Sequence, residues 1–249
     1  MDRTPSLTET GQSSPEDRPS KTGGARGAPP PTDISPLDQV GWLATQPEAF
    51  RGWVRRSGRW RHYAKGQWLY QVGEESEAIF GLGEGALDVL IPISDDDQVT
   101  IHRAEPGFWI GDSGLLAGSR RVISVVAVAP SRVLTIPASH VRRLVAEHPE
   151  LWRCFYELAH RNGTLAVATL AEVLALSPEA RLARMLLRLA DAKGEVQATQ
   201  FDLARLLGVT RSSLQRALGH LQDEGSVRTG YGVIVVADRA RLEKAVAAG

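Results

Sequence analysis

Two arginines, Arg211 and Arg216, carry the clearest chemical signal in this chain of 249 residues. A guanidinium group can donate two parallel hydrogen bonds to the O6 and N7 atoms of guanine in the major groove of DNA. At about 100° per residue, both arginines fall on the same side of a helix as Ser212, Gln215 and Gly219. Arginines among such short or polar neighbours indicate a helix that can lie in the major groove and contact base edges.

The segment that contains these arginines, TQFDLARLLGVTRSSLQRALGHL at 199–221, is typical of a helix-turn-helix. The first helix is predicted at about 200–207, and Gly208 ends it because glycine adopts the left-handed C-cap conformation freely. Thr210 is expected to cap the second helix by accepting a hydrogen bond from one of its first amides. The opposite side of that helix is apolar and should be buried: Leu214, Ala217, Leu218 and Leu221. An ordinary solvated helical hairpin is the alternative interpretation.

A β-hairpin is predicted directly after the second helix, with strands at 226–229 and 233–236 around Gly230-Tyr231-Gly232. A hairpin in this place makes the motif a winged one, and Arg228 and Tyr231 are expected to lie along the phosphate backbone. Phosphate contacts are also expected from Thr199, Gln200, Thr210 and Ser213. The predicted DNA-binding set is Thr199, Gln200, Thr210, Arg211, Ser212, Ser213, Gln215 and Arg216.

The composition limits the other function classes. The formal net charge of +0 argues against a generally basic coat for nucleic acids. The single cysteine, Cys154, excludes an intramolecular disulfide and an iron–sulfur cluster or zinc site held by four cysteines. No membrane span or apolar leader core is apparent, which predicts a cytoplasmic protein without a membrane partner. The sequence offers no nucleophile–base pair, metal-ligand spacing or paired carboxylates, so we expect neither an enzyme nor a metal site.

The sequence predicts an α+β chain with four parts. Residues 1–35 are rich in Pro, Gly, Ser and Thr and are expected to form a disordered tail. Residues 36–148 should form a β-barrel or β-sandwich domain, because short apolar segments alternate with Gly, Pro and Asp between about 60 and 137. Residues 149–176 should form one long dimerisation helix, and residues 177–249 the winged helix-turn-helix domain.

The long helix carries apolar residues on two faces. One line follows the four-and-three spacing of a coiled-coil seam: Leu151, Phe155, Leu158, Asn162, Leu165 and Thr169. A second apolar line contains Val167, Leu170 and Leu174. A helix that is apolar on two faces needs two partners, so the sequence predicts a homodimer. A long helix inside a monomer is the alternative. Ser177-Pro178-Glu179 is expected to end this helix and to form a hinge.

Two further motifs carry a family resemblance. The glycines and apolar residues from Tyr63 to Leu90 are spaced as in the cyclic-nucleotide-binding jelly roll, and Pro106–Leu116 (PGFWIGDSGLL) resembles its phosphate-binding cassette. Together with the long helix and the winged helix-turn-helix, this order resembles the CRP/FNR family of bacterial transcription regulators over about residues 36–236. The resemblance implies that residues 36–148 form a β jelly-roll sensor domain. It also implies a regulator that binds double-stranded DNA at inverted repeats as a homodimer, with RNA polymerase as a further partner.

The resemblance also implies an effector pocket, which would involve Gly111, Asp112, Ser113, Gly114, Leu115, Arg120 and Arg121. Relatives that bind cyclic AMP hold the ribose with a glutamate and the phosphate with an arginine. Here Asp112 takes the glutamate position, and the Arg-Ser pair falls on Val122-Ile123, one position after Arg121. Ala166-Val167 replaces the Thr-Ser pair that contacts the base. Cyclic AMP is therefore expected to bind weakly or not at all, since unpaired buried polar groups weaken binding.

Haem is a further effector known in the family, but its candidate ligands form no diagnostic spacing, so haem is not expected. These candidates are His62, His102, His140, His148, His160, His220 and Cys154. In DNA reading, the family usually places a glutamate directly after the first arginine, where this chain has Ser212, so the preferred DNA site should differ. The competing interpretation is a cyclic-nucleotide-binding-like regulatory module that acts through protein contacts and keeps a vestigial helix-turn-helix.

Overall fold

The computed structural model describes residues 32–93, 98–230 and 232–248. Most of the predicted tail and the wing residue Tyr231 lie outside these ranges. Within the described residues no helix is both long enough and apolar enough to cross a membrane.

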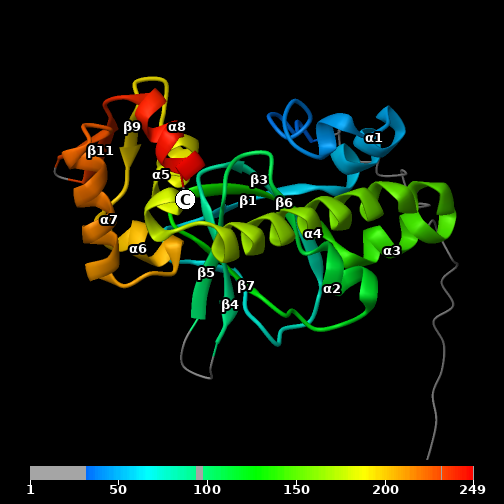
Figure 1. The fold of residues 1–249 in the computed structure, drawn as a ribbon. Coiled ribbons are helices and arrows are strands. Elements are labelled where there is room, and N and C mark those ends of the chain that lie inside the picture. Colours follow the sequence, from blue (N-terminus) through cyan, green and yellow to red (C-terminus); the bar gives the residue numbers. More distant parts are fainter. Residues whose placement is uncertain (1–31, 94–97, 231, 249) are drawn as a thin grey trace, which may run out of the picture. The chain divides into compact units, whose positions relative to one another are not determined.

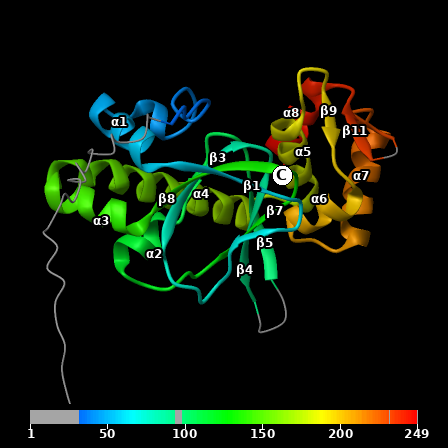
Figure 2. The same ribbon diagram turned by 180° about the vertical axis from the view of Figure 1, so that it is seen from behind.

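Two antiparallel sheets of four strands form the β-roll, in the orders β1-β8-β3-β6 and β2-β7-β4-β5 (Figures 1 and 2). The strands are β1 (Arg59–Tyr63), β2 (Trp68–Tyr70), β3 (Ala78–Glu84), β4 (Leu87–Pro92), β5 (Gln98–Ala104), β6 (Trp109–Ile110), β7 (Ser124–Ala127) and β8 (Ser131–Pro137). The short helix α2 (Asp112–Ala117) follows β6, and η1 (Leu43–Thr45) and α1 (Glu48–Ser57) precede β1. The predicted jelly-roll fold is confirmed.

The core of the roll includes a cluster of aromatic side chains that ties three segments together. Trp42 contacts Phe50, Trp109 and Phe155 at ring-centroid distances of 5.5, 5.3 and 6.5 Å. Its indole nitrogen donates a hydrogen bond to the carbonyl oxygen of Cys154 at 2.9 Å, which fixes the N-terminal segment on α4. The same cluster contains the fully buried Ile34, so the folded part starts before residue 36, where the sequence predicts its boundary.

The helix α4 (Trp152–Ala175) runs along the roll, after α3 (Ala138–Glu147) and the short η2 (Pro149–Leu151). Its bounds are close to the predicted helix at 149–176. Phe155 and Leu158 are 0% and 1% exposed and belong to the core of the roll. The helix is therefore anchored to its own chain through this face.

The C-terminal part contains α5 (Pro178–Leu189), β9 (Glu195–Gln197), α6 (Gln200–Leu207), α7 (Arg211–Asp223), β10 (Val227–Thr229), β11 (Val233–Val236) and α8 (Arg239–Ala248). Ser177 caps α5, because its hydroxyl accepts a hydrogen bond from the amide of Ala180 at 3.1 Å. β10 and β11 pair as the predicted wing, and β9 adds a third strand against β11. β9 was not predicted from the sequence, because its three residues carry no periodic signal.

Candidate nucleic-acid interface and sensor pocket

The helix α7 presents a polar stripe on one side and buries an apolar one on the other. Thr210 caps the helix, since its hydroxyl accepts a hydrogen bond from the amide of Ser213 at 3.2 Å. The predicted apolar side is fully buried: Leu214, Ala217, Leu218 and Leu221. The exposed side contains Arg211, Ser212, Gln215 and Arg216. Neither arginine forms a hydrogen bond or ion pair with another described residue, so both guanidinium groups are available to a partner.

The helix α6 is fixed by a reciprocal cap before the turn. The hydroxyl of Thr199 accepts a hydrogen bond from the amide of Asp202 at 3.1 Å and donates one to its carboxylate at 2.7 Å. Gly208 ends α6 with φ of 62°, in the left-handed region that the sequence predicts. Thr199 and Gln200 are exposed at the start of α6. The first amides of a helix favour anions, which makes this end suited to a phosphate group.

Arg205 of α6 makes an ionic contact with the β-roll that no sequence pattern predicts. Its Nη2 atom donates a hydrogen bond to Oδ2 of Asp88 on β4 at 2.7 Å, and its Nε atom donates to Oγ1 of Thr100 on β5 at 3.0 Å. The carboxylate of Asp88 is 0% exposed and also accepts two hydrogen bonds from Arg103, at 2.8 and 3.1 Å. One buried carboxylate thus joins the helix-turn-helix to the roll. No sequence signal marks a pair of residues that lie 117 positions apart.

A cavity of about 540 Å³ lies between the roll and α4, and we call it the sensor pocket. Its wall is mostly apolar and includes Val89, Phe108, Ile110, Val122, Ile123 and Ala166. Of the seven residues predicted for the effector pocket, only Asp112 and Ser113 line this cavity. The predicted place of the pocket, at the start of α2, is therefore close to the observed cavity, but most of its lining residues were missed.

Arg121 is turned away from the sensor pocket. Its side chain donates hydrogen bonds to the carbonyl oxygens of Gly111 at 2.8 Å and Ala78 at 2.5 Å, and its guanidinium carbon lies 4.2 Å from the centroid of the Tyr70 ring. Burial lowers the pKa of Arg121 and raises that of Tyr70. Gly111 permits this approach, since a Cβ atom there would lie 2.9 Å from Nη1 of Arg121.

The other residues predicted for the effector pocket make contacts within the β-roll instead. Arg120 is exposed and forms an ion pair with Glu75 at 2.6 Å. Leu115 belongs to the core, and a Cβ atom on Gly114 would lie 2.4 Å from Oγ of Ser76. The prediction that Arg120 and Arg121 line the effector pocket is wrong for this structure, because backbone carbonyls and a surface glutamate hold the two side chains.

Asp112 borders the sensor pocket, but its carboxylate is buried beneath the pocket wall. Its Oδ1 atom accepts a hydrogen bond from Nδ2 of Asn162 at 3.1 Å, and the same amide donates to the carbonyl oxygen of Trp109 at 3.1 Å. The Oδ2 atom is buried and has no partner among the described residues. Burial raises the pKa of the Asp112 carboxyl above its ordinary value.

The face of α4 that the sequence predicts as a dimer seam packs on its own roll. Leu151, Phe155 and Leu158 pack in the core, Asn162 bonds to Trp109 and Asp112, and Leu165 and Thr169 line the sensor pocket. Phe155 and Leu158 are therefore unavailable to a second subunit, because they are buried in the roll, and a seam through the other four positions stays a prediction.

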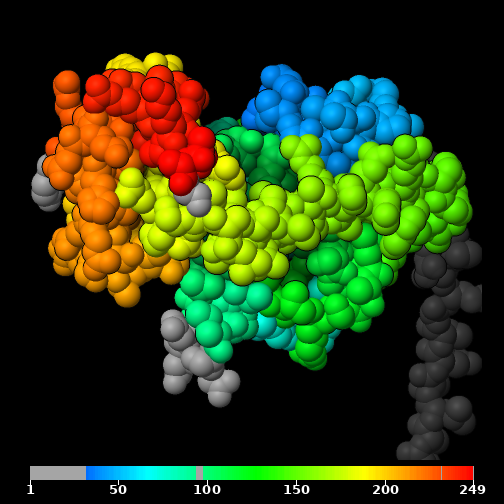
Figure 3. All heavy atoms as spheres, in the orientation of Figure 1, coloured from blue at the N-terminus to red at the C-terminus, as the bar shows by residue number. Residues whose placement is uncertain are grey.

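The second apolar line of α4, to which the exposed Tyr156 can be added, is largely open to solvent, and Leu170 in it also borders the sensor pocket. Its large side chains are exposed: Tyr156 by 61%, Val167 by 68%, Leu170 by 57% and Leu174 by 78%. In the space-filling view of Figure 3, α4 runs across the front face without being covered by other elements. At about 100° per residue, Val167 and Leu174 lie well over a quarter-turn from the face that packs on the roll, and Leu170 lies closer to that face. An exposed apolar line of this kind is typical of an interaction surface.

We expect the stability of the fold to depend on pH through His102, which lies in the wall of the sensor pocket. Burial and the positive charge of Arg188 lower the pKa of His102 to about 4, from an ordinary value of 6.5. Between these values the unfolded chain binds a proton that the folded chain does not, so stability should fall as pH decreases from about 6.5 to about 4. Thermal unfolding at several pH values should show a weaker decrease for His102→Gln than for the wild type. His62→Gln, at an exposed position, is the control, and equal slopes for all three proteins would contradict the prediction.

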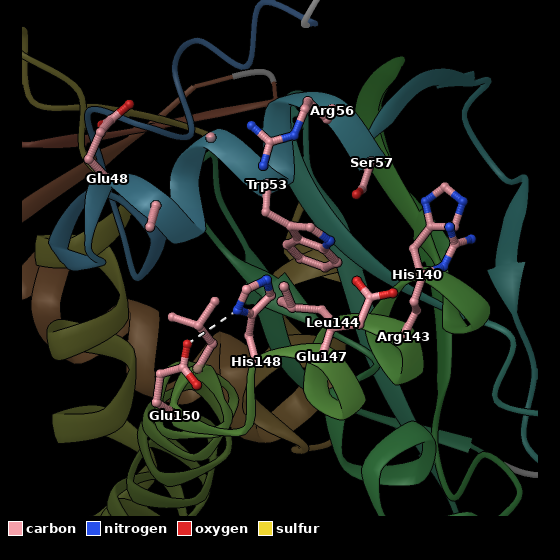
Figure 4. A pocket seen from close by; sticks show the side chains of 13 residues that line it. Glu48, Trp53, Arg56, Ser57, His140, Arg143, Leu144, Glu147, His148 and Glu150 are labelled. Carbon is pink, nitrogen blue, oxygen red and sulfur yellow. Dashed lines mark ion pairs between the residues drawn. The ribbon is translucent and has the colours of Figure 1, made fainter. Parts of the chain in front are cut away.

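A second cavity, of about 800 Å³, lies between α1 and α3 and mixes charges of both signs (Figure 4). Arg56 and Arg143 line it together with Glu48 and Glu147, and His148 already pairs with Glu150 at 3.4 Å. No residue predicted for the effector site lies there. Among the described residues, no group of three or more His, Cys, Asp or Glu could hold a metal ion. Burial raises the pKa of Cys154 to about 11, which disfavours its thiolate form.

Comparisons with known proteins agree with this architecture. Residues 60–148 match the model of the cyclic nucleotide-binding domain, and residues 180–245 match that of the Crp-like helix-turn-helix domain. The transcriptional regulatory protein btr of Bordetella pertussis is 26% identical over 191 residues, which cover 73% of this chain and 78% of btr. A cyclic AMP receptor protein of Thermus thermophilus is 28% identical over 193 residues, or 74% of this chain and 86% of that protein.

Solved structures show the same fold. FixK2 from Bradyrhizobium japonicum has a TM-score of 0.66 at 20% identity, and the match covers 75% of this chain and 96% of FixK2. A CRP/FNR-family transcriptional regulator from Thermus thermophilus has a TM-score of 0.64 at 20% identity, and the match covers 76% of this chain and 98% of that regulator.

Proposed function

Because this chain belongs to the CRP/FNR family of transcription regulators, we propose that it binds inverted-repeat DNA sites as a homodimer under the control of its sensor domain. The observation that carries the proposal is the exposed stripe of α7, where Arg211 and Arg216 have no partner among the described residues. The relatives are named as regulators of transcription and not as enzymes.

The arrangement of α6 and α7 supports separate contacts to the bases and to the phosphates of DNA. Arg211 and Arg216 would donate to guanines in the major groove, and Ser212 and Gln215 would contact neighbouring bases. Thr199, Gln200, Thr210 and Ser213 would hold phosphates at the N-terminal ends of α6 and α7. Partial positive charge at these ends favours such contacts. Ser212 lacks the carboxylate with which a glutamate would accept from a cytosine amino group, so the preferred site should differ from that of relatives with the glutamate.

The exposed line Tyr156, Val167, Leu170 and Leu174 supports the homodimer. These residues recur at the spacing of a parallel coiled-coil seam, and a second copy of the same helix offers an equal apolar surface. The dimer would place two copies of α7 on one side of a DNA duplex. RNA polymerase as a partner and the cytoplasm as the location follow from the family and remain predictions.

A binding-site selection with the purified chain tests the proposed function. The recovered sequences should contain an inverted repeat whose half-site centres lie about 10 bp apart, or a multiple of that, because DNA turns once in this distance. The double variant Arg211→Ala with Arg216→Ala serves as the control and should recover no common motif. If the wild type also recovers none, the chain is better described as a regulatory module that acts through protein contacts with a vestigial helix-turn-helix.

A further inference from the structure

No buried apolar cluster of the described chain crosses the joint between the roll and the helix-turn-helix domain. The buried residues of the C-terminal cluster lie within 182–242, and those of the two clusters of the roll lie within 34–158. Between them, α4 ends at Ala175 and α5 begins at Pro178, and the backbone of Leu176 and Ser177 is extended. The orientation of the domain therefore depends mainly on polar contacts.

Among the described residues, side-chain hydrogen bonds cross this joint at two places. Arg184 of α5 pairs with Glu172 of α4 at 3.0 Å, but both side chains are partly exposed, and such surface pairs add little stability. Arg205 of α6 pairs with Asp88 and also donates to the buried Thr100. Although Arg205 is 40% exposed, the carboxylate of Asp88 is 0% exposed, and a charged hydrogen bond is stronger where water is excluded. The contact of Arg205 is therefore the stronger of the two.

Asp88 does not need Arg205 to balance its charge. Within the roll, Arg103 already donates to both oxygens of this carboxylate, at 2.8 and 3.1 Å. Arg205 adds a third hydrogen bond, at 2.7 Å, from the other domain. A change at Arg205 would leave Asp88 paired, so the roll should keep its fold. The third bond holds α6 on the roll and is not required by the roll itself.

The surface that is proposed to contact DNA stays open while Arg205 is bound to the roll. The predicted base-contacting residues of α7 are all exposed: Arg211, Ser212, Gln215 and Arg216. The roll itself is fixed to α4, because Phe155 and Leu158 are buried in its core. A continuous series of contacts thus runs from α4, the helix of the proposed dimer interface, through β4 to the helix-turn-helix.

We infer that Arg205 and Asp88 are positioning residues that set the spacing between the two half-sites of the DNA. In the proposed homodimer, their contact holds each copy of α7 at one place relative to α4, so the two copies contact half-sites at one separation. Without the contact, each domain turns about residues 176–177, and the dimer accepts several spacings. This inference rests on the proposed function, because it presupposes a dimer that binds two half-sites.

DNA duplexes with altered spacing test the inference by fluorescence anisotropy on the full chain. Two base pairs added between the selected half-sites turn one half-site by about 70° relative to the other. The wild type should lose at least about tenfold in affinity on this insertion, because its two helices no longer fit both half-sites. Arg205→Met should bind the original site more weakly, since the domain is now ordered only on binding, and should lose less than about threefold on insertion.

Two further variants separate positioning from loss of charge. Arg239→Met removes a cation of the same domain that pairs with Glu243 within α8 at 3.1 Å, and it should keep the spacing preference of the wild type. Thr100→Val removes the second acceptor of Arg205 with little change in volume and should relax the preference in part. Thermal unfolding checks that each variant is folded.

Pulsed electron paramagnetic resonance measures the orientation of the domain without DNA. Spin labels at His62→Cys on β1 and Asp223→Cys on α7 report the distance between the roll and the helix-turn-helix. Both positions are exposed, whereas the native Cys154 is buried and so protected from the label. Labelled chains are diluted with unlabelled ones, so that distances within one chain are measured. The distance distribution should be narrow in the wild-type background and broad with Arg205→Met.

Four results would overturn the inference: equal binding of both spacings by the wild type, an unchanged spacing preference in Arg205→Met, a relaxed preference in Arg239→Met, or an unchanged distance distribution in Arg205→Met. An unchanged preference with weaker binding would show that Arg205 contacts a DNA phosphate instead. If the selection recovers no motif, the proposed function and the spacing fail together, whereas the spin-label distances still show whether Arg205 holds the domain.

Discussion

Arg216→Ala is expected to weaken binding to the selected DNA site by about 1–3 kcal/mol for each half-site, which is roughly a five- to 150-fold loss per half-site. The guanidinium group of Arg216 lies on the exposed stripe of α7, so the change removes no hydrogen bond or ion pair among the described residues. The loss should be accompanied by a relaxed preference at one symmetric base position. Fluorescence anisotropy titrations with the selected site and single-base variants of it measure both effects.

Arg228→Ala in the wing is the matched control for this prediction. Arg228 is exposed on β10, and a phosphate contact from it would weaken binding about equally for all sequences and reduce the salt dependence. Ser212→Glu should shift the selected motif toward a cytosine at the corresponding position, because a carboxylate accepts from the cytosine amino group. A selected motif that is unchanged in Arg216→Ala would show that the bases are contacted by another part of the chain.

The double change Val167→Glu with Leu174→Glu should convert the dimer into monomers and lower the affinity for the inverted repeat by about a hundredfold or more, since two linked half-site contacts become one. Both side chains are exposed, by 68% and 78%, and neither lines the sensor pocket. Glutamates at these positions would face their own copies across the two-fold axis, so like charges would repel where apolar side chains now meet. Analytical ultracentrifugation at micromolar concentration measures the mass.

Ala168→Glu with Ala175→Glu provides the control for the dimer prediction. It adds the same charge with the same spacing on α4, at exposed positions about a quarter-turn or more away from the proposed seam. This variant should remain a dimer and retain its affinity for DNA. If the variant at Val167 and Leu174 also sediments as a dimer, this face of α4 is not the interface.

The helix-turn-helix could be predicted closely because its signals are local. The caps at Thr199 and Thr210 and the left-handed Gly208 set the ends of α6 and α7 within a few residues of chain. The four-and-three spacing from Leu151 to Thr169 correctly predicted that one face of α4 packs against another element. It could not predict whether that element belongs to the same chain or to a second subunit. Both faces of α4 satisfy a four-and-three spacing, and the choice depends on residues such as Trp109, which lies 53 positions from Asn162.

The sensor pocket shows the same limit in another form. Asp112 and Arg121 are close in sequence, but the sequence does not show which acceptors receive hydrogen bonds from the Arg121 guanidinium group. The positive φ of 95° at Gly111 exposes a carbonyl to the guanidinium group, and the ring of Tyr70 lies beneath it. These contacts depend on how three separate segments meet, so only the structure shows that Arg121 supports the roll and does not line the pocket.

Two consecutive residues of β4 connect the sensor pocket with the helix-turn-helix. Asp88 accepts from Arg205 of the helix-turn-helix, and Val89 lines the sensor pocket, because neighbouring side chains of a strand point to opposite faces. Any coupling free energy carried by this strand acts in both directions. If a ligand in the pocket changes DNA affinity by a given factor, then DNA changes the ligand's affinity by the same factor. The DNA site then acts as an effector of the sensor domain. A chain bound to its DNA site would become half-saturated with ligand at a different ligand concentration from a chain free in solution.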